Sequence, residues 1–142
     1  MLNALTQRFD HPDGAKLLLR LTFSVLLLFH GIHKALPGGD LGFIQDLLMK
    51  AGLPGFIAWG VFIGEILCPI LIILGIFTRW AAIIVSFTML TAVALANGTQ
   101  IFALAPTGAW IIESAAFYFL LGIVIFLLGG GRYSVMTNPE YR

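Results

Sequence analysis

Four long apolar stretches constrain this chain more than any other feature. An α-helix needs about 20 apolar residues to cross the hydrocarbon of a bilayer. Four segments approach or reach that length, at residues 17–36, 54–77, 80–96 and 110–128. Because 59% of the 142 residues are hydrophobic and only 11% are charged, the composition excludes a soluble fold. The predicted fold is all-α, a transmembrane four-helix bundle that forms a single domain over residues 1–142.

Basic residues predict the orientation of these spans. Lys and Arg near the ends of membrane spans are held on the cytoplasmic side. With both termini cytoplasmic, only Lys34 and Lys50 lie outside, whereas six basic residues lie inside: Arg8, Lys16, Arg20, Arg79, Arg132 and Arg142. We therefore expect cytoplasmic N- and C-termini and a lipid bilayer as the main partner. The net charge of +1 and the short tails give no sign of nucleic-acid binding.

The two outer loops differ in their pattern. Asp40 stands where an N-cap is expected, and the apolar residues after it recur at helical spacing until Gly52 and Pro54 end the segment. This predicts a short amphipathic helix along the outer interface of the membrane or over the mouth of the bundle; the alternative is a connector without function. The second loop, residues 97–109, carries no charge and is expected to fold back over the helix ends. Together the two loops suggest a lid.

Ionisable residues inside the spans are the candidates for function, because a charge in lipid is costly unless it is paired or hydrated. Glu65 lies roughly 16 Å into the second span, and Glu113 and His30 lie roughly 9 Å below the outer end of theirs. His33 and Lys34 follow His30 on the same helix face. These five residues are the candidates for ligand binding or proton transfer. For His33, the alternative is a hydrated residue at the interface.

Glu65 has an unusual local setting. Pro69, four residues later, has no N–H to offer the carbonyl of Glu65, which predicts a kinked helix with a polar spot deep in the membrane. Gly60, Gly64 and Cys68 form a ridge of small residues beside it, where a neighbouring helix can approach closely. The alternative role of Glu65 is a protonated side chain that is hydrogen-bonded to another helix.

Other chemistry is suggested less directly. Two imidazoles and a carboxylate suit zinc, copper or iron, so His30, His33 and Glu113 are a candidate metal set. Cys68 is the only cysteine, which excludes an intramolecular thiol pair and favours a packing role. For Arg20, near the inner end of the first span, we expect a side chain that snorkels to lipid phosphate, with an inward reach to a carboxylate as the alternative.

The order and spacing of several short motifs resemble the DoxX family. They are Arg20 in Leu-Leu-Leu-Arg-Leu, His-Gly-Ile-His-Lys at 30–34, Gly-Leu-Pro at 52–54, Glu65, Leu-Gly-Ile-Phe-Thr-Arg at 74–79 and Gly-Gly-Gly-Arg-Tyr-Ser at 129–134. The resemblance runs from about Lys16 to Val135. It implies a small four-helix protein of the bacterial inner membrane, related to the membrane subunit of thiosulfate:quinone oxidoreductase and to members associated with thiol and oxidative-stress systems. His33 is extra to the usual pattern and favours a metal-linked branch, because some relatives are encoded with copper-handling systems.

Three functions remain open from the residues and the resemblance. The first is a redox-associated membrane subunit, in which a quinone binds near His30, Glu65 or Glu113 and a partner protein supplies electrons. The second is a transporter or handling factor for a metal ion such as copper, a proton or a small ligand, assembled as a homo-oligomer or with a partner. The third is a structural or assembly protein. Whether the chain is an enzyme is not decided at this stage.

Overall fold

The computed structural model describes residues 10–142 and is built from helices in that part of the chain. The order is α2 (Pro12–Ala35), α3 (Leu41–Lys50), a 3-10 helix η1 (Gly55–Gly60), a π-helix η2 (Ile63–Leu67), α4 (Cys68–Leu74), α5 (Thr78–Ala96), a 3-10 helix η3 (Gly98–Gln100) and α6 (Glu113–Leu128). No strand forms among the described residues, where only one isolated bridge joins Leu104 and Trp110. The all-α prediction is confirmed for this part of the chain.

Within residues 10–142, three helical segments are long and apolar enough to cross a membrane: Pro12–Ala35, Gly55–Leu74 and Thr78–Ala96. The fourth apolar helix, α6, has 16 residues and starts at Glu113, three residues after the start of the predicted span. The reason is local. The Trp110 indole N–H donates a hydrogen bond to the carbonyl of Ile101, which holds Trp110 in the loop. At about 1.5 Å per residue, α6 is roughly 24 Å long.

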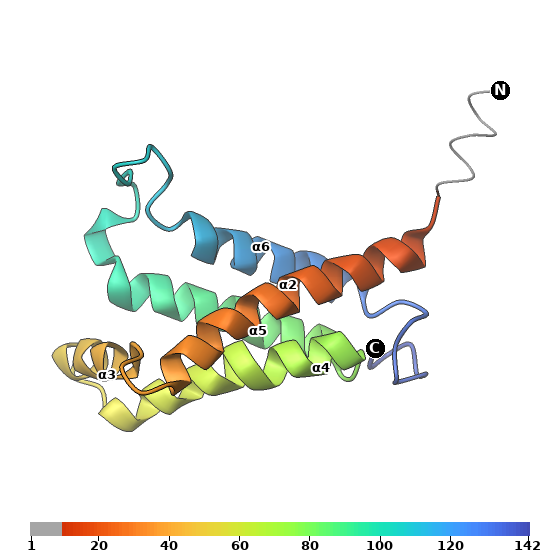
Figure 1. The fold of residues 1–142 in the computed structure, drawn as a ribbon, viewed down its shortest axis with the longest axis horizontal. Coiled ribbons are helices and arrows are strands. Elements are labelled where there is room, and N and C mark those ends of the chain that lie inside the picture. The colour runs from red at the N-terminus through yellow and green to blue at the C-terminus, as the bar shows by residue number, and fades with distance from the viewer. Residues whose placement is uncertain (1–9) are drawn as a thin grey trace.

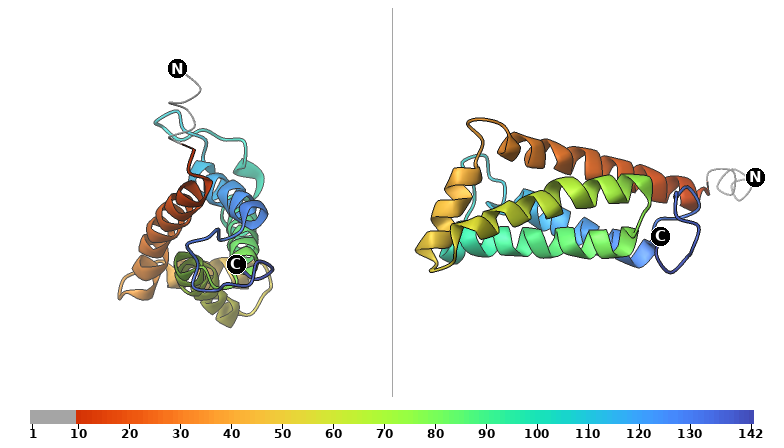
Figure 2. Two further views of the ribbon diagram at one scale, coloured as in Figure 1. Left: turned by 90° about the vertical axis from the view of Figure 1, so that its right-hand side faces the viewer. Right: turned by 90° about the horizontal axis from the view of Figure 1, so that it is seen from below.

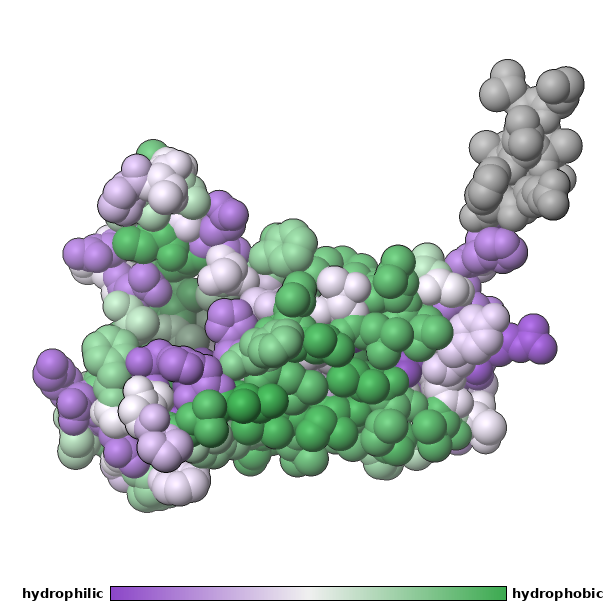
Figure 3. Space-filling view, in the orientation of Figure 1, coloured by the Kyte–Doolittle hydropathy of each residue, from purple (hydrophilic) through white to green (hydrophobic). Residues whose placement is uncertain are grey.

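The four apolar segments lie alongside one another, and their loops gather at two ends (Figure 1; Figure 2). At one end α2 begins, α4 turns into α5 and the chain finishes; we call this end the base. At the opposite end, the mouth, α3 lies across the second span and the loop 97–112 projects outwards. Hydrophilic residues cover both ends, and a wide apolar surface lies between them (Figure 3).

Packing between the helices leaves the outer faces apolar. Phe29, Phe87 and Leu127 are each more than 60% exposed, on α2, α5 and α6 respectively. Such large exposed apolar side chains are typical of a surface that faces lipid. The buried core lies between the helices and consists of Phe23, Leu27, Cys68, Ile72, Ala81, Ala82, Val85, Met89 and Ile125.

The predicted small-residue ridge packs closely at one of its glycines. A Cβ at Gly64 would overlap the Thr88 side chain of α5, so the second span and α5 touch there. Cys68 is 1% exposed and belongs to the core, in agreement with its predicted packing role. Gly60 has nothing near its Cβ position and is exposed, so it takes no part in this contact.

Arg20 is buried at the base, with 1% of its surface exposed. Its guanidinium donates hydrogen bonds to the carbonyls of Ile72, Ile73, Gly130 and Tyr133 and to the hydroxyl of Ser134. Both sequence-based expectations for Arg20, snorkelling to phosphate and pairing with a carboxylate, are therefore wrong. The physical reason is that α4 ends beside it, where carbonyls lack their full set of helical partners, and a planar guanidinium with five N–H donors matches them.

The turn between α4 and α5 is shaped around this arginine. Gly75 has a φ of +74°, and a Cβ there would overlap the Ser134 side chain and the Arg20 guanidinium. Two residues later Phe77 has a φ of 46°, a left-handed conformation that is uncommon outside glycine. The motifs at 74–79 and 129–134 therefore meet at Arg20 and hold the base together.

The loops at the mouth differ from expectation in two ways. The predicted amphipathic helix is present as α3, but Asp40 at its N-cap position makes no side-chain capping hydrogen bond. In the loop 97–112, Phe102 is 85% and Leu104 is 68% exposed. These two apolar side chains of the loop are therefore not buried over the helix ends. Of the two loops that were expected to form a lid, only the one that contains α3 lies across the bundle.

Candidate functional site

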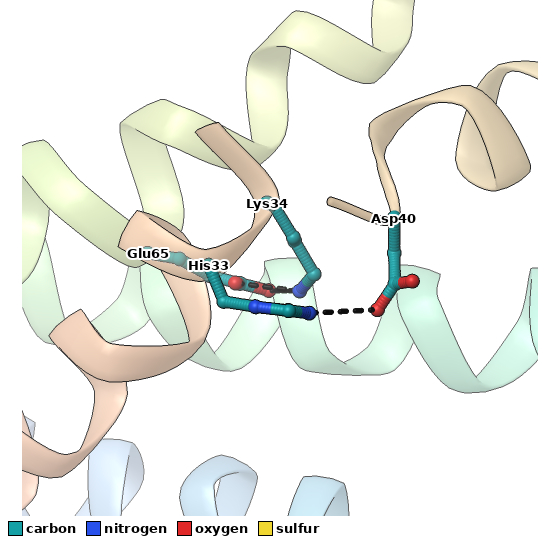
Figure 4. A network of polar contacts seen from close by, with 4 residues as sticks. All are labelled: His33, Lys34, Asp40 and Glu65. Carbon is teal, nitrogen blue, oxygen red and sulfur yellow. Dashed lines mark hydrogen bonds and ion pairs between the residues drawn. The ribbon is translucent and has the colours of Figure 1, made fainter. Parts of the chain in front are cut away.

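An ion pair between Lys34 and Glu65 lies close to the mouth (Figure 4). The Lys34 ammonium is 2.6 Å from each carboxylate oxygen of Glu65. The Glu65 side chain is 2% exposed and that of Lys34 is 20% exposed. Both residues were candidates from the sequence, and the structure brings them into direct contact. Two charges this far from solvent are tolerated because each neutralises the other.

Local sequence explains why these two side chains meet. Lys34 lies in the last turn of α2, and Glu65 lies within the π-helix η2, four residues before Pro69. In η2 the N–H of Cys68 bonds to the carbonyl of Ile63, five residues back. Single-turn π segments of this kind occur frequently at functional sites. The expected irregularity near Pro69 is therefore present as a π segment that carries the carboxylate.

Gly31 brings α2 against this segment. A Cβ at Gly31 would overlap the carbonyl of Glu65 and the Ile66 side chain, so any larger residue would push α2 away. The same carbonyl is the one that Pro69 leaves without an N–H partner four residues later. Since Lys34 is three residues after Gly31, the close approach places the ammonium over the carboxylate.

A large cavity of about 480 Å³ borders the ion pair on the side of α3. Its walls come from α3, η1, the second span and α5, and they are mostly apolar. The polar groups in its lining are few: Lys34, Asp40, Glu65, Thr88 and Thr91. This size and this pattern, apolar walls with a few polar groups, are typical of small-molecule sites.

A second cavity of about 150 Å³ borders the same ion pair on the side of α6. Its lining is more polar and includes His30, Ser114 and Tyr118 together with Lys34 and Glu65. The His30 and Tyr118 rings meet edge to face at 5.8 Å between their centroids. Lys34, Glu65 and Ala92 line both cavities, so the ion pair stands where the two adjoin.

The other candidate residues lie apart from the pair. His33 is exposed, with its Nε2 3.9 Å from an Asp40 oxygen (Figure 4). Glu113 is exposed at the start of α6 and lines neither cavity. Among residues 10–142, no three His, Cys, Asp or Glu side chains gather as a metal site would require. The candidate set of His30, His33 and Glu113 is therefore not assembled: His30 lines the smaller cavity, whereas His33 and Glu113 are exposed and line neither cavity.

Sequence reasoning missed Tyr118, which lines the smaller cavity. A signal was available, because Ser114 and Tyr118 are four residues apart and hence share one face of a helix that is otherwise apolar. Sequence reasoning also assigned Asp40 to a helix cap, whereas Asp40 lines the larger cavity. No local pattern shows that contact, since it depends on how α3 folds back.

The pair offers both a donor and an acceptor to a ligand. An ammonium carries three protons, and among the described residues Lys34 Nζ makes two hydrogen bonds, both to Glu65. One N–H can therefore serve an acceptor atom in the larger cavity. The carboxylate can accept a proton or a hydrogen bond, and the low polarity around it strengthens either interaction.

Comparisons with known proteins identify the family. The sequence model of the DoxX family matches residues 15–98, more than half of the chain. Searches of curated proteins and of solved structures gave no match. The matched segment contains Arg20, Lys34 and Glu65, and it covers α2, α3, the second span and α5. The chain is therefore a membrane protein that belongs to the DoxX family.

Proposed function

We propose that this chain is a multi-pass protein of the bacterial inner membrane, with four spans, both termini in the cytoplasm and the mouth on the outer side. The apolar surface between two hydrophilic ends supports this (Figure 3). Arg20 is buried, so we leave it out of the comparison of basic residues on the two sides of the membrane. Arg8 lies outside the described residues, and the remaining basic residues keep the same bias, with Lys34 and Lys50 at the mouth and Lys16, Arg79, Arg132 and Arg142 on the other side.

The function that the geometry supports best is binding of a membrane quinone in the larger cavity, as part of a redox system. The observation that carries this proposal is the Lys34–Glu65 pair in the wall of a 480 Å³ cavity that is otherwise mostly apolar. A quinone has an apolar ring and tail and two carbonyl oxygens, so it needs apolar walls and few donors. Lys34 has one N–H to donate to such a carbonyl, and Glu65 is in reach to exchange a proton.

Electrons would come from a partner redox protein. Reduction of a quinone takes two electrons and two protons and yields the quinol, and the only cysteine, Cys68, is buried and cannot form a thiol pair within the chain. The role of this chain is then to hold the ring, orient one carbonyl towards Lys34 and exclude bulk water. α3 covers the cavity on its outer side, with Phe43, Ile44 and Leu47 in the lining.

A binding titration with a cavity-filling variant tests this proposal. The protein is reconstituted in lipid nanodiscs, and a short-tailed ubiquinone analogue is titrated while tryptophan fluorescence is followed. Thr91→Phe places a ring inside the larger cavity, so we expect binding weaker by at least about tenfold, a loss of about 1.4 kcal/mol. Leu90→Phe is the matched control, because Leu90 precedes it on α5, is 55% exposed and lines neither cavity.

Three results would contradict the quinone proposal. Unchanged affinity in Thr91→Phe would show that the quinone does not enter this cavity. Stoichiometric transition metal in the purified protein, lost in both His30→Ala and Glu65→Gln, would favour metal handling. If neither ligand binds, the polar residues hold the bundle together, and a structural or assembly role is the better account.

A further inference from the structure

The smaller cavity is not needed to hold the quinone, yet it borders the same ion pair. It lies between α2, α5 and α6, on the opposite side of Lys34 and Glu65 from the larger cavity. Its volume of about 150 Å³ exceeds the ~10–15 Å³ that one water molecule needs. Polar groups on two helices line it, and cavities of this kind hold water whereas apolar ones stay dry.

We propose that this smaller cavity is a water-filled route by which protons reach the Lys34–Glu65 pair from the outer aqueous phase. His30 and Ser114 lie at its exposed edge, and Glu65, with 2% of its side chain exposed, lies at its inner end. Tyr118 lies in its wall, in edge-to-face contact with His30. The inference deepens the proposed quinone site, since a quinone that is reduced there takes up two protons.

The charges around the route are consistent with proton passage. α2 contributes Lys34 and His30, α6 contributes Tyr118 and Ser114, and α5 contributes only Met89 and Ala92. On the other side of the pair, the larger cavity adds one charged residue, Asp40. A hydroxyl, an imidazole and water can each accept and donate a proton in turn. The pair thus meets water on one side and an apolar cavity on the other.

Cysteine labelling tests the water-filled route without a measurement of quinone binding. In a Cys68→Ala background, Met89→Cys and Ala115→Cys place thiols in the lining of the smaller cavity. Leu90→Cys is the matched control on the lipid-facing side of α5, where it lines neither cavity. Cells are treated from outside with a positively charged, membrane-impermeant methanethiosulfonate, which reacts with the thiolate and hence needs water.

We expect both cavity thiols to react at least about tenfold faster than the thiol of the Leu90→Cys control, because a thiol in lipid does not ionise. Ser114→Cys, at the exposed edge, should react fastest. If Met89→Cys and Ala115→Cys are as inert as Leu90→Cys while Ser114→Cys reacts, the cavity is not open to outside water and the inference is wrong. Because the readout is thiol reactivity and not quinone affinity, this failure is distinct from failure of quinone binding.

The sidedness of proton access is tested by a lipid-soluble carbodiimide, which modifies protonated carboxyl groups. In right-side-out membrane vesicles, the inner and outer pH are varied separately, and modification of Glu65 is quantified by mass spectrometry, with Glu65→Gln as the blank. We expect the modification of Glu65 to increase when the outer pH falls and to stay constant when only the inner pH changes. Modification that follows the inner pH, or neither pH, would overturn the proposed route.

Discussion

Two cations on the same helix, buried Arg20 at the base and partly buried Lys34 near the mouth, have opposite surroundings. Arg20 is enclosed by neutral oxygens that belong to α4 and the C-terminal segment, and it borders neither of the two cavities. Lys34 faces a single carboxylate and borders both cavities. The contrast shows that burial and charge alone do not mark a functional site. Lys34 borders open volume and Arg20 does not, and this difference distinguishes the candidate site at Lys34 from the structural contact at Arg20.

The two ends also differ in what the charge stabilises. At the base, one guanidinium joins three segments of the chain, since its acceptors lie in α4 and on both sides of Arg132. At the mouth, one ammonium joins only α2 to η2. We therefore expect changes at Arg20 to act on folding, and changes at the pair to act on both stability and ligand binding.

The largest effect is expected for Arg20→Met. It removes five hydrogen bonds and leaves buried carbonyls without donors, so the free energy of unfolding should fall by at least about 4 kcal/mol. The measurement is the yield of monodisperse protein and its thermal unfolding in detergent. Arg132→Met is the control, because Arg132 is exposed and bonds to Asp13 only through its backbone N–H. A variant that unfolds at the wild-type temperature would contradict the structural role of Arg20.

The next largest effect is expected for single changes in the ion pair. Lys34→Met or Glu65→Met leaves the other partner without its counter-charge in a mostly apolar setting, which should lower the free energy of unfolding by about 3 kcal/mol. Lys34→Met/Glu65→Met removes both charges and should recover most of that loss. Unfolding of all three variants gives a double-mutant cycle. Additive losses would show that the two side chains do not interact.

A smaller effect is expected where α2 approaches η2. Gly31→Ala forces the helix away from the Glu65 carbonyl, and overpacking of this kind costs about 2 kcal/mol. It should also weaken quinone binding, since it separates Lys34 from Glu65. Gly42→Ala is the matched control, because nothing lies near its Cβ position and it lines neither cavity. Equal unfolding temperatures for the two variants would argue against the close contact at Gly31.

The smallest effect is expected at His33. Its contact with Asp40 is 3.9 Å long, and both side chains are more than 60% exposed. His33→Ala should therefore change the free energy of unfolding by less than about 0.5 kcal/mol. Quinone titration of the same variant should match that of the wild type. A marked loss of binding would extend the functional site beyond the Lys34–Glu65 pair.

Helices were easier to predict from this sequence than contacts between them. Apolar runs and Pro69 identify the helical segments and the irregular turn at Glu65, because both depend on neighbours in sequence. The start of the fourth predicted span and the side-chain cap at Asp40 differ from the structure, since each depends on contacts made by a folded loop. Arg20 was misassigned because its acceptors lie more than 50 positions away, and carbonyls carry no signal in a sequence.

The Lys34–Glu65 contact was half predictable. The sequence identifies both residues as charges inside spans, but not that they pair, because the pairing depends on Gly31 and on the register between α2 and η2. The cavities could not be predicted at all, since empty volume depends on how helix α3 and three spans pack around it.

Quinone titration of Lys34→Met/Glu65→Met in nanodiscs tests the central claim most directly. Both charges are absent, so the bundle remains stable while the donor and the proton acceptor are lost. We predict thermal unfolding close to that of the wild type together with binding of the ubiquinone analogue that is weaker by at least about tenfold. Wild-type affinity in this stable double variant would contradict the assignment of the ion pair as the ligand site.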